Sequence, residues 1–433
     1  MRLLRLTFRF LHIAWVVFVA SVVYGLRRLG LLFRGGDREA RERLLGEVLA
    51  DTFQKLGATY VKFGQILSTR PDLFGPGITE ALAHLQDQVP PFPFAEVEQV
   101  LDAELDATTR SRLVVDPTPM AAASVAQVHR ATFDGDPIAL KVQRPKARTQ
   151  VERDLVLMAF GARLADKIPS VRLLSLPGSV ERFATAMHGQ LDFRLEAANN
   201  RRFAENFANL EGVGVPALHD ELCTERVLGM EMIEGIKATD PERVGGDRAA
   251  LARRGLRCIL QMVFEDGFVH ADLHPGNILL TDRDEVILID LGLVAEIEDD
   301  LRQPWIQTFV ALAGQDGKLA AKVFYTYAPA VGNTDYAAFE REVQTAFESL
   351  SGKAIQEMEA SKVLMGMMSV LRRHRVQIDP VFTVVNLAML VAEGLGKQLD
   401  PTLDLIAEAT PYLAKALATA PPPRPPRREA PPT

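Results

Sequence analysis

The 433-residue sequence has very little cysteine, because Cys223 and Cys258 are the only two thiols and they lie far apart. Two thiols cannot form a disulfide framework or supply the four ligands of a structural zinc site. An excess of positive charge is also missing, since 49 Lys and Arg residues are outnumbered by 56 Asp and Glu residues and the net charge is −7. A protein that binds nucleic acid broadly needs a basic surface, so the composition argues against that class.

Aromatic residues are few as well, at 7% of the chain, and only two are tryptophan. Hydrophobic residues nevertheless make up 48% and charged residues 24%, which is ordinary for a protein with a buried core. This balance excludes a disordered, collagen-like or coiled-coil protein. The length predicts roughly two to three domains.

Charged side chains are missing from residues 10–26. At about 1.5 Å per helical residue, this stretch is at the lower limit for crossing roughly 30 Å of hydrocarbon. More arginines follow it than precede it, which places the body of the protein in the cytoplasm if the segment crosses the cytoplasmic membrane. We predict a membrane anchor within residues 1–36. The alternatives are a helix that lies in the interface or packs on the protein, and a cleaved signal peptide.

The opposite end is rich in proline. Residues 421–433 hold seven prolines and three arginines, which predicts a disordered tail, with a proline-rich ligand as the alternative.

Between the two ends, the pattern predicts helices, then a small sheet, then a mostly helical half. Helices are expected over residues 38–86 with a turn at Arg70-Pro71-Asp72, and over 94–105, 145–167, 176–210, 248–266 and 301–417. Hairpins are expected to pair residues 124–133 with 138–143 and residues 277–280 with 285–289, and further strands lie near 215–218 and 226–233. This α+β order is that of a two-lobed protein-kinase-like fold, although other α+β proteins share it.

The most informative segment is residues 269–292, VHADLHPGNILLTDRDEVILIDLG. Asp272 and Asn277 have the spacing of the kinase catalytic loop, D-x-x-x-x-N, and Asp290 follows the predicted hairpin at the D-F-G position. Carboxylate and amide oxygens are the ligands that Mg²⁺ prefers. We therefore assign Asn277 and Asp290 to the metal and Asp272 to the phosphoryl acceptor. A polar loop before an ordinary hairpin would not explain these three residues in this register.

A kinase also needs a lysine on a strand and a glutamate on a helix. Lys141 ends the run Ile138-Ala139-Leu140-Lys141, which matches the V-A-I-K strand pattern. Glu196 lies in a long predicted helix and is the candidate partner, although Asp192 and Glu181 in the same helix leave the pairing open.

A glycine-rich phosphate loop is missing where one is expected. Its place in the chain is taken by residues 119–129, with Ala121, Ala122, Ala123, Ser124 and Val125 as candidate nucleotide-binding residues. Alanine keeps the backbone N–H but loses easy access to positive φ, so a stiffer loop is expected. The alternative is a helix start capped near Ser124. Lys141, Glu231 and Met232 complete the expected nucleotide-binding set.

The long activation segment of a protein kinase is missing too. After Asp290-Leu291-Gly292 the chain soon enters the helix expected near Leu301, and there is no A-P-E motif. Phosphorylation of other proteins is therefore disfavoured.

Together these motifs resemble the UbiB/AarF-related (ABC1-type) family of atypical protein-kinase-like proteins. The resemblance covers roughly residues 45–294. It rests on KFGQ at residues 62–65, AAASVAQVH at 121–129, ALKVQRP at 139–145, LDFRLEAANN at 191–200, and HADLHPGN with IDLG. KFGQ and the alanine-rich loop are specific to the family, whereas HADLHPGN occurs more widely.

The resemblance implies a kinase-like fold, Mg²⁺-dependent binding of ATP or ADP, ATPase activity and a role in ubiquinone biosynthesis at a membrane. It implies a helical KxGQ extension over residues 37–112, an N-lobe over 113–235 and a helical C-lobe over 236–420. Lys62 is then expected to reach toward the phosphates. Expected partners are membrane lipid and quinone-biosynthesis enzymes or lipid precursors, without nucleic acid.

Two features depart from the family pattern. Gln190 stands where the family usually has glutamate, which leaves Asp192 as the expected main contact of Lys62. The apolar spans that many members carry near the C-terminus are interrupted here by charged residues, so the N-terminal segment is the expected anchor. Two other functions remain: a small-molecule phosphotransferase of the aminoglycoside or choline kinase type, and a catalytically silent nucleotide-binding scaffold.

Overall fold

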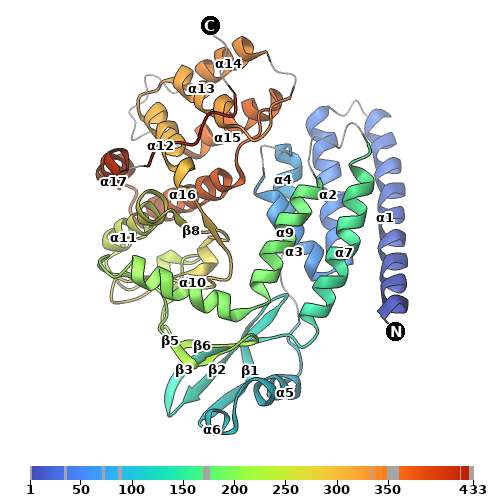
Figure 1. Ribbon diagram of the computed structural model, residues 1–433, viewed down its shortest axis with the longest axis vertical. Helices are drawn as coiled ribbons and strands as arrows, with labels where there is room; N and C mark the ends of the chain where they lie inside the picture. The colour runs from blue at the N-terminus through green and yellow to red at the C-terminus, as the bar shows by residue number, and fades with distance from the viewer. Residues whose placement is uncertain are drawn as a thin grey trace. The chain divides into compact units, whose positions relative to one another are not determined.

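The computed structural model describes residues 2–33, 37–70, 74–85, 90–168, 176–332, 335–348, 360–419 and 421–428 (Figure 1). The chain forms two compact units. Unit 1 comprises Met1–Ala197 and Ala217–Met232, and unit 2 comprises Ala198–Pro216 and Ile233–Thr433. The change of unit at Met232 falls close to the expected boundary after residue 235. The segment 198–216, which was expected in the N-lobe, is instead part of unit 2.

Unit 1 begins with helices: α1 (Arg2–Phe33), α2 (Arg38–Leu56), α3 (Ala58–Ser68) and α4 (Pro76–Ala83). Asp37 caps α2 by accepting a hydrogen bond from the Ala40 N–H at 2.8 Å. Gly57 ends the helix at φ 94°, a value that glycine adopts easily, so α3 can start in a new direction. Of the expected turn, Pro71 and Asp72 lie outside the described residues.

The sheet of unit 1 is antiparallel, with the order β1-β2-β3-β6-β5. Its strands are β1 (Leu113–Ala122), β2 (Ala126–Phe133), β3 (Asp136–Gln143), β5 (Leu218–Cys223) and β6 (Val227–Glu231). Asp134 and Gly135 both have positive φ at the β2–β3 turn, as a tight two-residue hairpin requires. The alternative of a helix start at Ser124 is wrong, because β1 pairs with β2 on either side of it. Pro117 and Pro119 obscured β1, and such prolines are tolerated because β1 is an edge strand.

The remaining helices of unit 1 are α5 (Phe94–Glu104), α6 (Ala107–Ser111), α7 (Ala147–Ala165), α9 (Leu176–Gln190) and the start of α10 (Phe193–Asn206). The single helix expected over residues 176–210 is broken at Leu191 and Asp192. The side chain of Asp192 accepts a hydrogen bond from the Arg194 N–H at 3.1 Å, which favours a new helix start there. One apolar cluster joins the helices, with the rings of Phe63 and Phe183 5.1 Å apart, and another lies under the sheet.

Unit 2 combines short strands with many helices. A sheet of order β4-β10-β9-β7 contains β4 (Val213–Gly214), β7 (Ile236–Lys237), β9 (Ile278–Leu280) and β10 (Val286–Leu288). A second pair joins β8 (Phe268–His270) to β11 (Val294–Glu296). The expected hairpin of β9 and β10 is confirmed by their antiparallel register.

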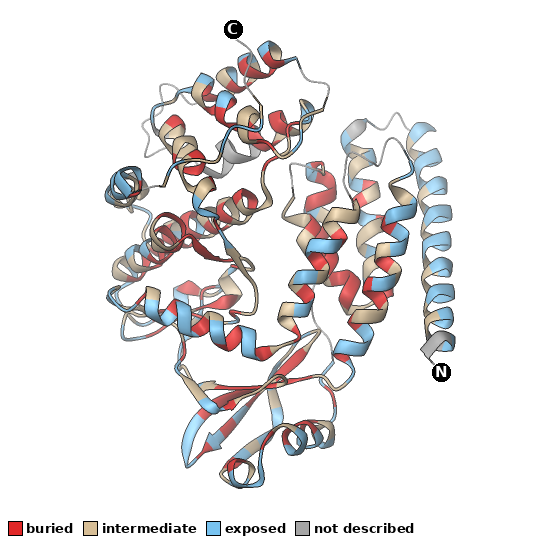
Figure 2. Ribbon diagram, in the orientation of Figure 1, coloured by how far each residue is buried: buried red, intermediate tan, exposed pale blue. Residues whose placement is uncertain are grey.

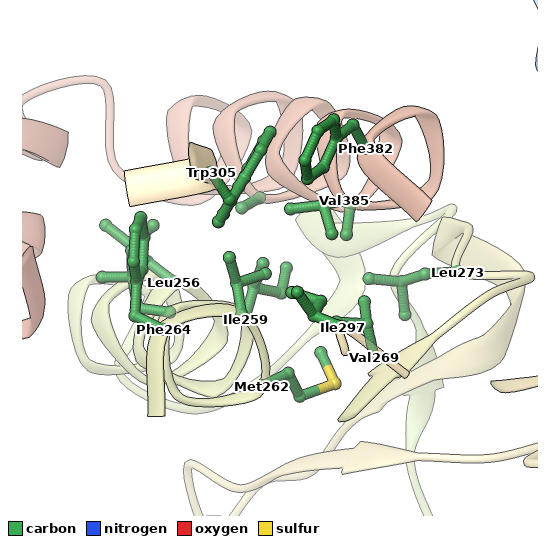
Figure 3. Close-up of a cluster of buried hydrophobic side chains, with 14 of the residues drawn as sticks. Leu256, Ile259, Met262, Phe264, Val269, Leu273, Ile297, Trp305, Phe382 and Val385 are labelled. Carbon is green, nitrogen blue, oxygen red and sulfur yellow. The ribbon is translucent and has the colours of Figure 1, made fainter. Parts of the chain in front are cut away.

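The helices of unit 2 follow the expected order. They are η1 (Pro241–Arg243), α11 (Arg248–Leu260), the π-helical η2 (Gln261–Asp266), η3 (Pro275–Asn277), α12 (Asp299–Ala313), α13 (Gly317–Tyr327), α14 (Tyr336–Glu348), α15 (Ala360–Arg373), α16 (Pro380–Leu399) and α17 (Leu405–Thr419). Their apolar faces form one large core (Figure 2). In its centre Trp305 stacks on Phe382 with ring centroids 5.1 Å apart, and Val269 of β8 and Leu273 point into the same cluster (Figure 3). The core therefore fixes both sides of the segment that carries Asp272.

Within the described part of the chain, two helices are long and apolar enough to cross a membrane, by length and composition alone: the stretch Leu6–Phe33 of α1, and α16. Half of the apolar window of α16 is buried, and Phe382, Val385 and Ala388 lie in the core of unit 2. Burial explains its hydrophobic character without a membrane.

The described part of the C-terminal tail, residues 421–428, is held against unit 2. Arg424 donates hydrogen bonds to Asp300 at 2.8 Å and Glu298 at 2.6 Å, and Arg428 donates to the Tyr325 carbonyl at 2.9 Å. These contacts differ from the expected disorder, because the arginines find acidic and carbonyl partners that a proline count does not reveal. Residues 429–433 lie outside the described chain.

Candidate functional site

The catalytic-loop residues of unit 2 come together between β8 and the β9–β10 hairpin. Asn277 ends η3, is 7% exposed, and donates from Nδ2 to the carbonyl oxygen of Asp272 at 3.0 Å. Its backbone oxygen accepts from the Ile289 N–H at 2.9 Å, which brings the residue before Asp290 against Asn277. Hydrogen bonds on both sides of Asn277 thus connect it to the backbone of Asp272 and to Ile289, the residue before Asp290.

His270 organises this loop, and the sequence did not identify its role. Its Nδ1 accepts a hydrogen bond from the Asp272 N–H at 3.1 Å, and its Nε2 lies 3.2 Å from the carbonyl oxygen of Ile289. Burial lowers the pKa of His270, so the ring is neutral, with its proton on Nε2 and directed to Ile289. One imidazole therefore ties the segment before Asp272 to the segment before Asp290. The signal was the histidine that starts HADLHPGN.

Asp290 adopts a backbone conformation that most residues avoid. Its φ is 58°, in the left-handed region where Asp and Asn are tolerated better than other non-glycine residues. The next residue is fixed from α10, because Asn199 donates from Nδ2 to the Leu291 carbonyl at 2.9 Å within unit 2. Leu291 itself is 2% exposed in the core. The strained conformation of Asp290 is thus supported from two sides, as is common at functional sites.

The chemistry of these residues fits Mg²⁺ held together with phosphate oxygens. The Nδ2 of Asn277 is used by Asp272, so its Oδ1 is the amide atom left for a cation, and Asp290 supplies a carboxylate. Within the described residues, no group of three or more His, Cys, Asp or Glu side chains is placed to hold a metal by itself. Mg²⁺ typically takes only one or two protein carboxylates and completes its shell with phosphates and water.

Lys141 and Glu196 form a close ion pair in unit 1. Nζ of Lys141, on β3, lies 2.8 and 2.9 Å from the two carboxylate oxygens of Glu196, on α10. The side chains are 13% and 5% exposed, and Nζ lies 5.3 Å from the centre of the Phe193 ring. The partner of Lys141 is therefore Glu196, and not Asp192 or Glu181. The pair fixes a cationic group at the end of a strand in largely apolar surroundings.

The alanine-rich segment forms the tip of the β1–β2 hairpin. Ala121 and Ala122 pair with β2, and the Ala123 N–H donates to the Ala126 carbonyl at 2.8 Å. Arg144 closes the turn from the next strand, because its Nε donates to the Ala123 carbonyl and its backbone N–H to the Val125 carbonyl, both at 2.8 Å. Arg144 was not among the predicted site residues.

The hairpin tip also packs against the KFGQ helix region. Val125 contacts the apolar cluster that contains Tyr60 and Phe63. Ser124 and Val125 line a small cavity of about 20 Å³ together with Ala58 and Thr59 at the start of α3. Two family-specific sequence elements, the alanine loop and KFGQ, are therefore neighbours within unit 1.

Packing explains two of the four KFGQ residues. A Cβ on Gly64 would lie 2.4 Å from Leu85 Cδ1 and 2.7 Å from the Phe53 ring, so only glycine fits without a shift. Gln65 donates to the Leu85 carbonyl at 3.1 Å. Lys62 lies on the same helix and its assigned role stays a prediction. Asp192, its expected partner, forms an ion pair with Arg194 at 2.7 Å, and this pair lowers the pKa of Asp192.

Glu231 and Met232 lie where β6 leaves the sheet of unit 1. Glu231 exchanges hydrogen bonds with Ala217, accepting at its side chain at 3.2 Å and donating from its backbone at 2.8 Å. These bonds fix the end of the strand, and the nucleotide-binding role of Glu231 and Met232 stays a prediction.

These arrangements define an atypical kinase-like protein. An ABC1 atypical kinase-like domain matches residues 84–324, and a UbiB helical domain matches residues 343–404. The first match alone covers more than half of the chain. The chain belongs to this ABC1/UbiB family, which confirms the resemblance and the kinase-like fold expected from the sequence.

Curated relatives agree with this assignment. Proteins named "Probable protein kinase UbiB" from Shewanella pealeana and Vibrio cholerae are each 34% identical to the chain, over 87% of it and 71% of their own length. Among solved structures, Rv3197 from Mycobacterium tuberculosis in complex with erythromycin is similar, with a TM-score of 0.51 and 25% sequence identity. That similarity covers 78% of this chain and 90% of the other.

Proposed function

We propose that this protein is a membrane-associated atypical kinase or ATPase that binds Mg²⁺ with ATP or ADP and supports isoprenoid quinone (ubiquinone) biosynthesis. The observation that carries the proposal is the joining of Asp272, Asn277 and Asp290 around His270, in a chain that also pairs Lys141 with Glu196. Asn277 and Glu196 are buried polar groups and Asp290 has a positive φ, and such features are common at functional sites.

Each residue has a distinct role in the proposed chemistry. Lys141, oriented by Glu196, binds the nucleotide phosphates, and Asp272 lies nearest the acceptor oxygen and takes its proton. Asn277 and Asp290 would hold Mg²⁺, which neutralises charge on the phosphates. Transfer then depends mainly on positioning and electrostatics, because the protein does little covalent chemistry in such reactions.

The acceptor in this proposal is water or a small molecule. After Gly292 the chain forms β11 and then enters α12 at Asp299, so the segment that would carry a peptide platform is very short. Phosphorylation of other proteins is therefore disfavoured by the observed elements as well as by the missing A-P-E motif.

ATP turnover measured with and without membrane lipid separates the proposed ATPase from a silent scaffold, which would bind nucleotide without releasing phosphate. A soluble small-molecule kinase would turn over equally well without lipid. Quinone profiling of a deletion strain tests the biosynthetic role, and an unchanged quinone pool would contradict it.

We expect the alanine hairpin to restrain the nucleotide. Replacing Ala122 by Gly should relax the backbone at a paired, non-left-handed position and change the ratio of ATP to ADP affinity. Replacing Lys62 by Ala should change turnover, because a positive charge near the phosphates is lost. Nucleotide affinity, phosphate release and self-phosphorylation are measured in both variants.

Ala123→Gly serves as a neighbouring comparison, and Thr132→Gly, at an exposed position of β2, controls for weakening the sheet. If Ala122→Gly and Lys62→Ala both match wild type in ATP/ADP preference and phosphate release, the hairpin and the KFGQ helix are purely structural.

We further propose that residues 10–26 bind the protein to the cytoplasmic membrane, with the body on the cytoplasmic side. A shortened chain beginning at Asp37 should be soluble, folded and still able to bind nucleotide. The buried residues of the helical cluster come from other elements of unit 1, and α1 contributes the partly buried Ile13 and Val16, so the cluster should form without α1. Fractionation and thermal melting check this, and a full-length protein found in the soluble fraction without detergent would contradict it.

A further inference from the structure

Helix α1 is fixed to unit 1 by a buried ion pair near its start. Arg9 donates from Nε to Asp154 Oδ1 at 2.7 Å and from Nη2 to Asp154 Oδ2 at 2.9 Å, and Asp154 on α7 is only 1% exposed. Nη2 also donates to the backbone carbonyl of Leu56, the last residue of α2, at 2.6 Å. A bidentate, desolvated pair of this kind specifies one geometry. Ile13 and Val16 pack on the same helical cluster, so the inner face of α1 follows α2, and Arg9 connects it to α7.

This contact is incompatible with an α1 that crosses a membrane. Arg9 precedes the uncharged segment 10–26, whereas the body of the protein follows it. A crossing helix would separate these two ends by roughly 30 Å of hydrocarbon. Arg9 could then no longer reach Asp154 in the body.

The outer face of α1 is apolar along its whole length. Nine exposed apolar side chains recur at the spacing of one helix face: Leu4, Phe8, Leu11, Trp15, Phe18, Val22, Leu26, Leu29 and Phe33. Their exposures run from 45% to 89%. Figure 2 shows α1 as mostly exposed from end to end. The sequence of α1 contains no Asp or Glu.

Helix α7 carries a second exposed apolar stripe. Val156, Phe160 and Leu164 recur every four residues and are 58%, 58% and 57% exposed, and Ile168, just after the helix, is 50% exposed. They lie on the side of the helix opposite the buried residues Val151, Leu155, Met158 and Ala162. These exposed apolar side chains are not stabilised by burial in the folded chain. Such a row commonly marks an interaction surface.

Basic residues accompany the stripe. Arg163 is exposed and by helical periodicity lies on the outward side of α7 near Phe160 and Leu164, and the exposed Lys167 follows just after the helix ends at Ala165. A helix face that combines apolar and basic residues is typical of one that lies on an anionic lipid surface. Association of two copies of the protein through this surface is disfavoured, because the two basic surfaces would repel each other.

We propose that α7 and the outer face of α1 together dock unit 1 on an anionic bilayer, with α1 lying in the interface rather than crossing it. This rests on the proposed membrane association and specifies how it is achieved. The apolar side chains enter the boundary between headgroups and acyl chains, and the basic residues contact lipid phosphates.

The first test replaces Phe160 and Leu164 by Glu in the full chain. Flotation is measured with phosphatidylcholine vesicles, with and without phosphatidylglycerol. Wild type should float with the anionic vesicles, and the double variant should partition about tenfold less or worse, since two large apolar side chains lose their burial. Val114→Glu is the matched control, because Val114 is a 68% exposed residue of β1 outside this surface and should leave flotation unchanged.

Thermal melting and nucleotide binding of the double variant show that it is folded. Equal flotation of the folded variant and wild type overturns the role of α7. If light scattering instead shows that wild type self-associates without vesicles and the variant does not, the surface is a contact between copies and the lipid proposal is wrong. If wild type binds neither vesicle, the proposed membrane association itself fails.

The second test locates the start of α1. Thr7→Cys is introduced with Cys223→Ser, which leaves only the buried Cys258, and a membrane-impermeant maleimide is applied to spheroplasts and to inverted membrane vesicles. An interfacial α1 places position 7 on the cytoplasmic side, so labelling is expected only in inverted vesicles. Labelling only in spheroplasts would show a crossing helix and overturn the interfacial geometry, while membrane association would still stand.

Discussion

Replacing Asp290 by Asn should abolish Mg²⁺-dependent nucleotide binding while leaving the fold intact. The change removes a carboxylate from the proposed metal site, and the loss should exceed the roughly 10–100-fold that an outer-shell change costs a metal site. Asn tolerates the left-handed backbone that Asp290 adopts at φ 58°, so the β9–β10 hairpin should not be disturbed. Calorimetric titration with Mg²⁺-ADP measures the affinity directly.

Asp284→Asn is the matched control. Asp284 lies in the same hairpin, also has positive φ at 64°, and accepts a hydrogen bond from the Asp247 N–H that an amide oxygen can still accept. It should bind nucleotide as wild type does. Unchanged Mg²⁺-nucleotide affinity in Asp290→Asn would sink the assignment of this residue to the metal.

The second large effect is expected at Lys141 and Glu196. Lys141→Met removes the cation proposed to contact the phosphates, and ATP turnover should fall about 10²–10³-fold. Glu196→Gln keeps Lys141 but weakens the interaction that orients it, so a fall of about tenfold is expected. Combined in one chain, the two changes should cost much less than the product of their separate effects, because both act through one group. Phosphate release under saturating Mg²⁺-ATP provides the measurement.

Glu393→Gln controls for the loss of a buried acidic partner. Glu393 is 5% exposed and its side chain pairs with Lys397 at 2.7 Å on α16, much as Glu196 pairs with Lys141. The control can lower the melting temperature but should leave turnover unchanged. Equal turnover in wild type and Lys141→Met would remove Lys141 from the proposed site.

Local spacing was sufficient to predict much of the candidate site. Asp272, Asn277 and Asp290 lie within one short segment, and the hairpin between the last two has clear turn residues, so their meeting follows from nearby sequence alone. Lys141 was predicted from a strand pattern, and its partner Glu196 from helix position together with the family motif.

Long-range contacts could not be predicted in the same way. His270 joins two loops through its two ring nitrogens, Asn199 reaches Leu291, and Arg144 closes the alanine hairpin. Each of these side chains has many possible partners in the sequence, and only the folded chain selects one. The edge strand β1 was obscured by its prolines.

The same limit applies to the N-terminal helix. The composition predicts an apolar segment of nearly membrane-spanning length. It does not predict the buried ion pair between Arg9 and Asp154. That one contact changes the expected topology of the segment, because it requires Arg9 and the body to lie on the same side of the bilayer.

Mg²⁺-dependent nucleotide binding is tested most directly by calorimetric titration of the wild-type protein with ADP and ATP, in Mg²⁺ and in an excess of chelator. We expect one nucleotide per chain to bind in Mg²⁺ and binding to be lost in chelator, because Asn277 and Asp290 would hold the nucleotide through the metal. Absence of binding in Mg²⁺, or equal affinity with and without the metal, would contradict the proposed nucleotide site.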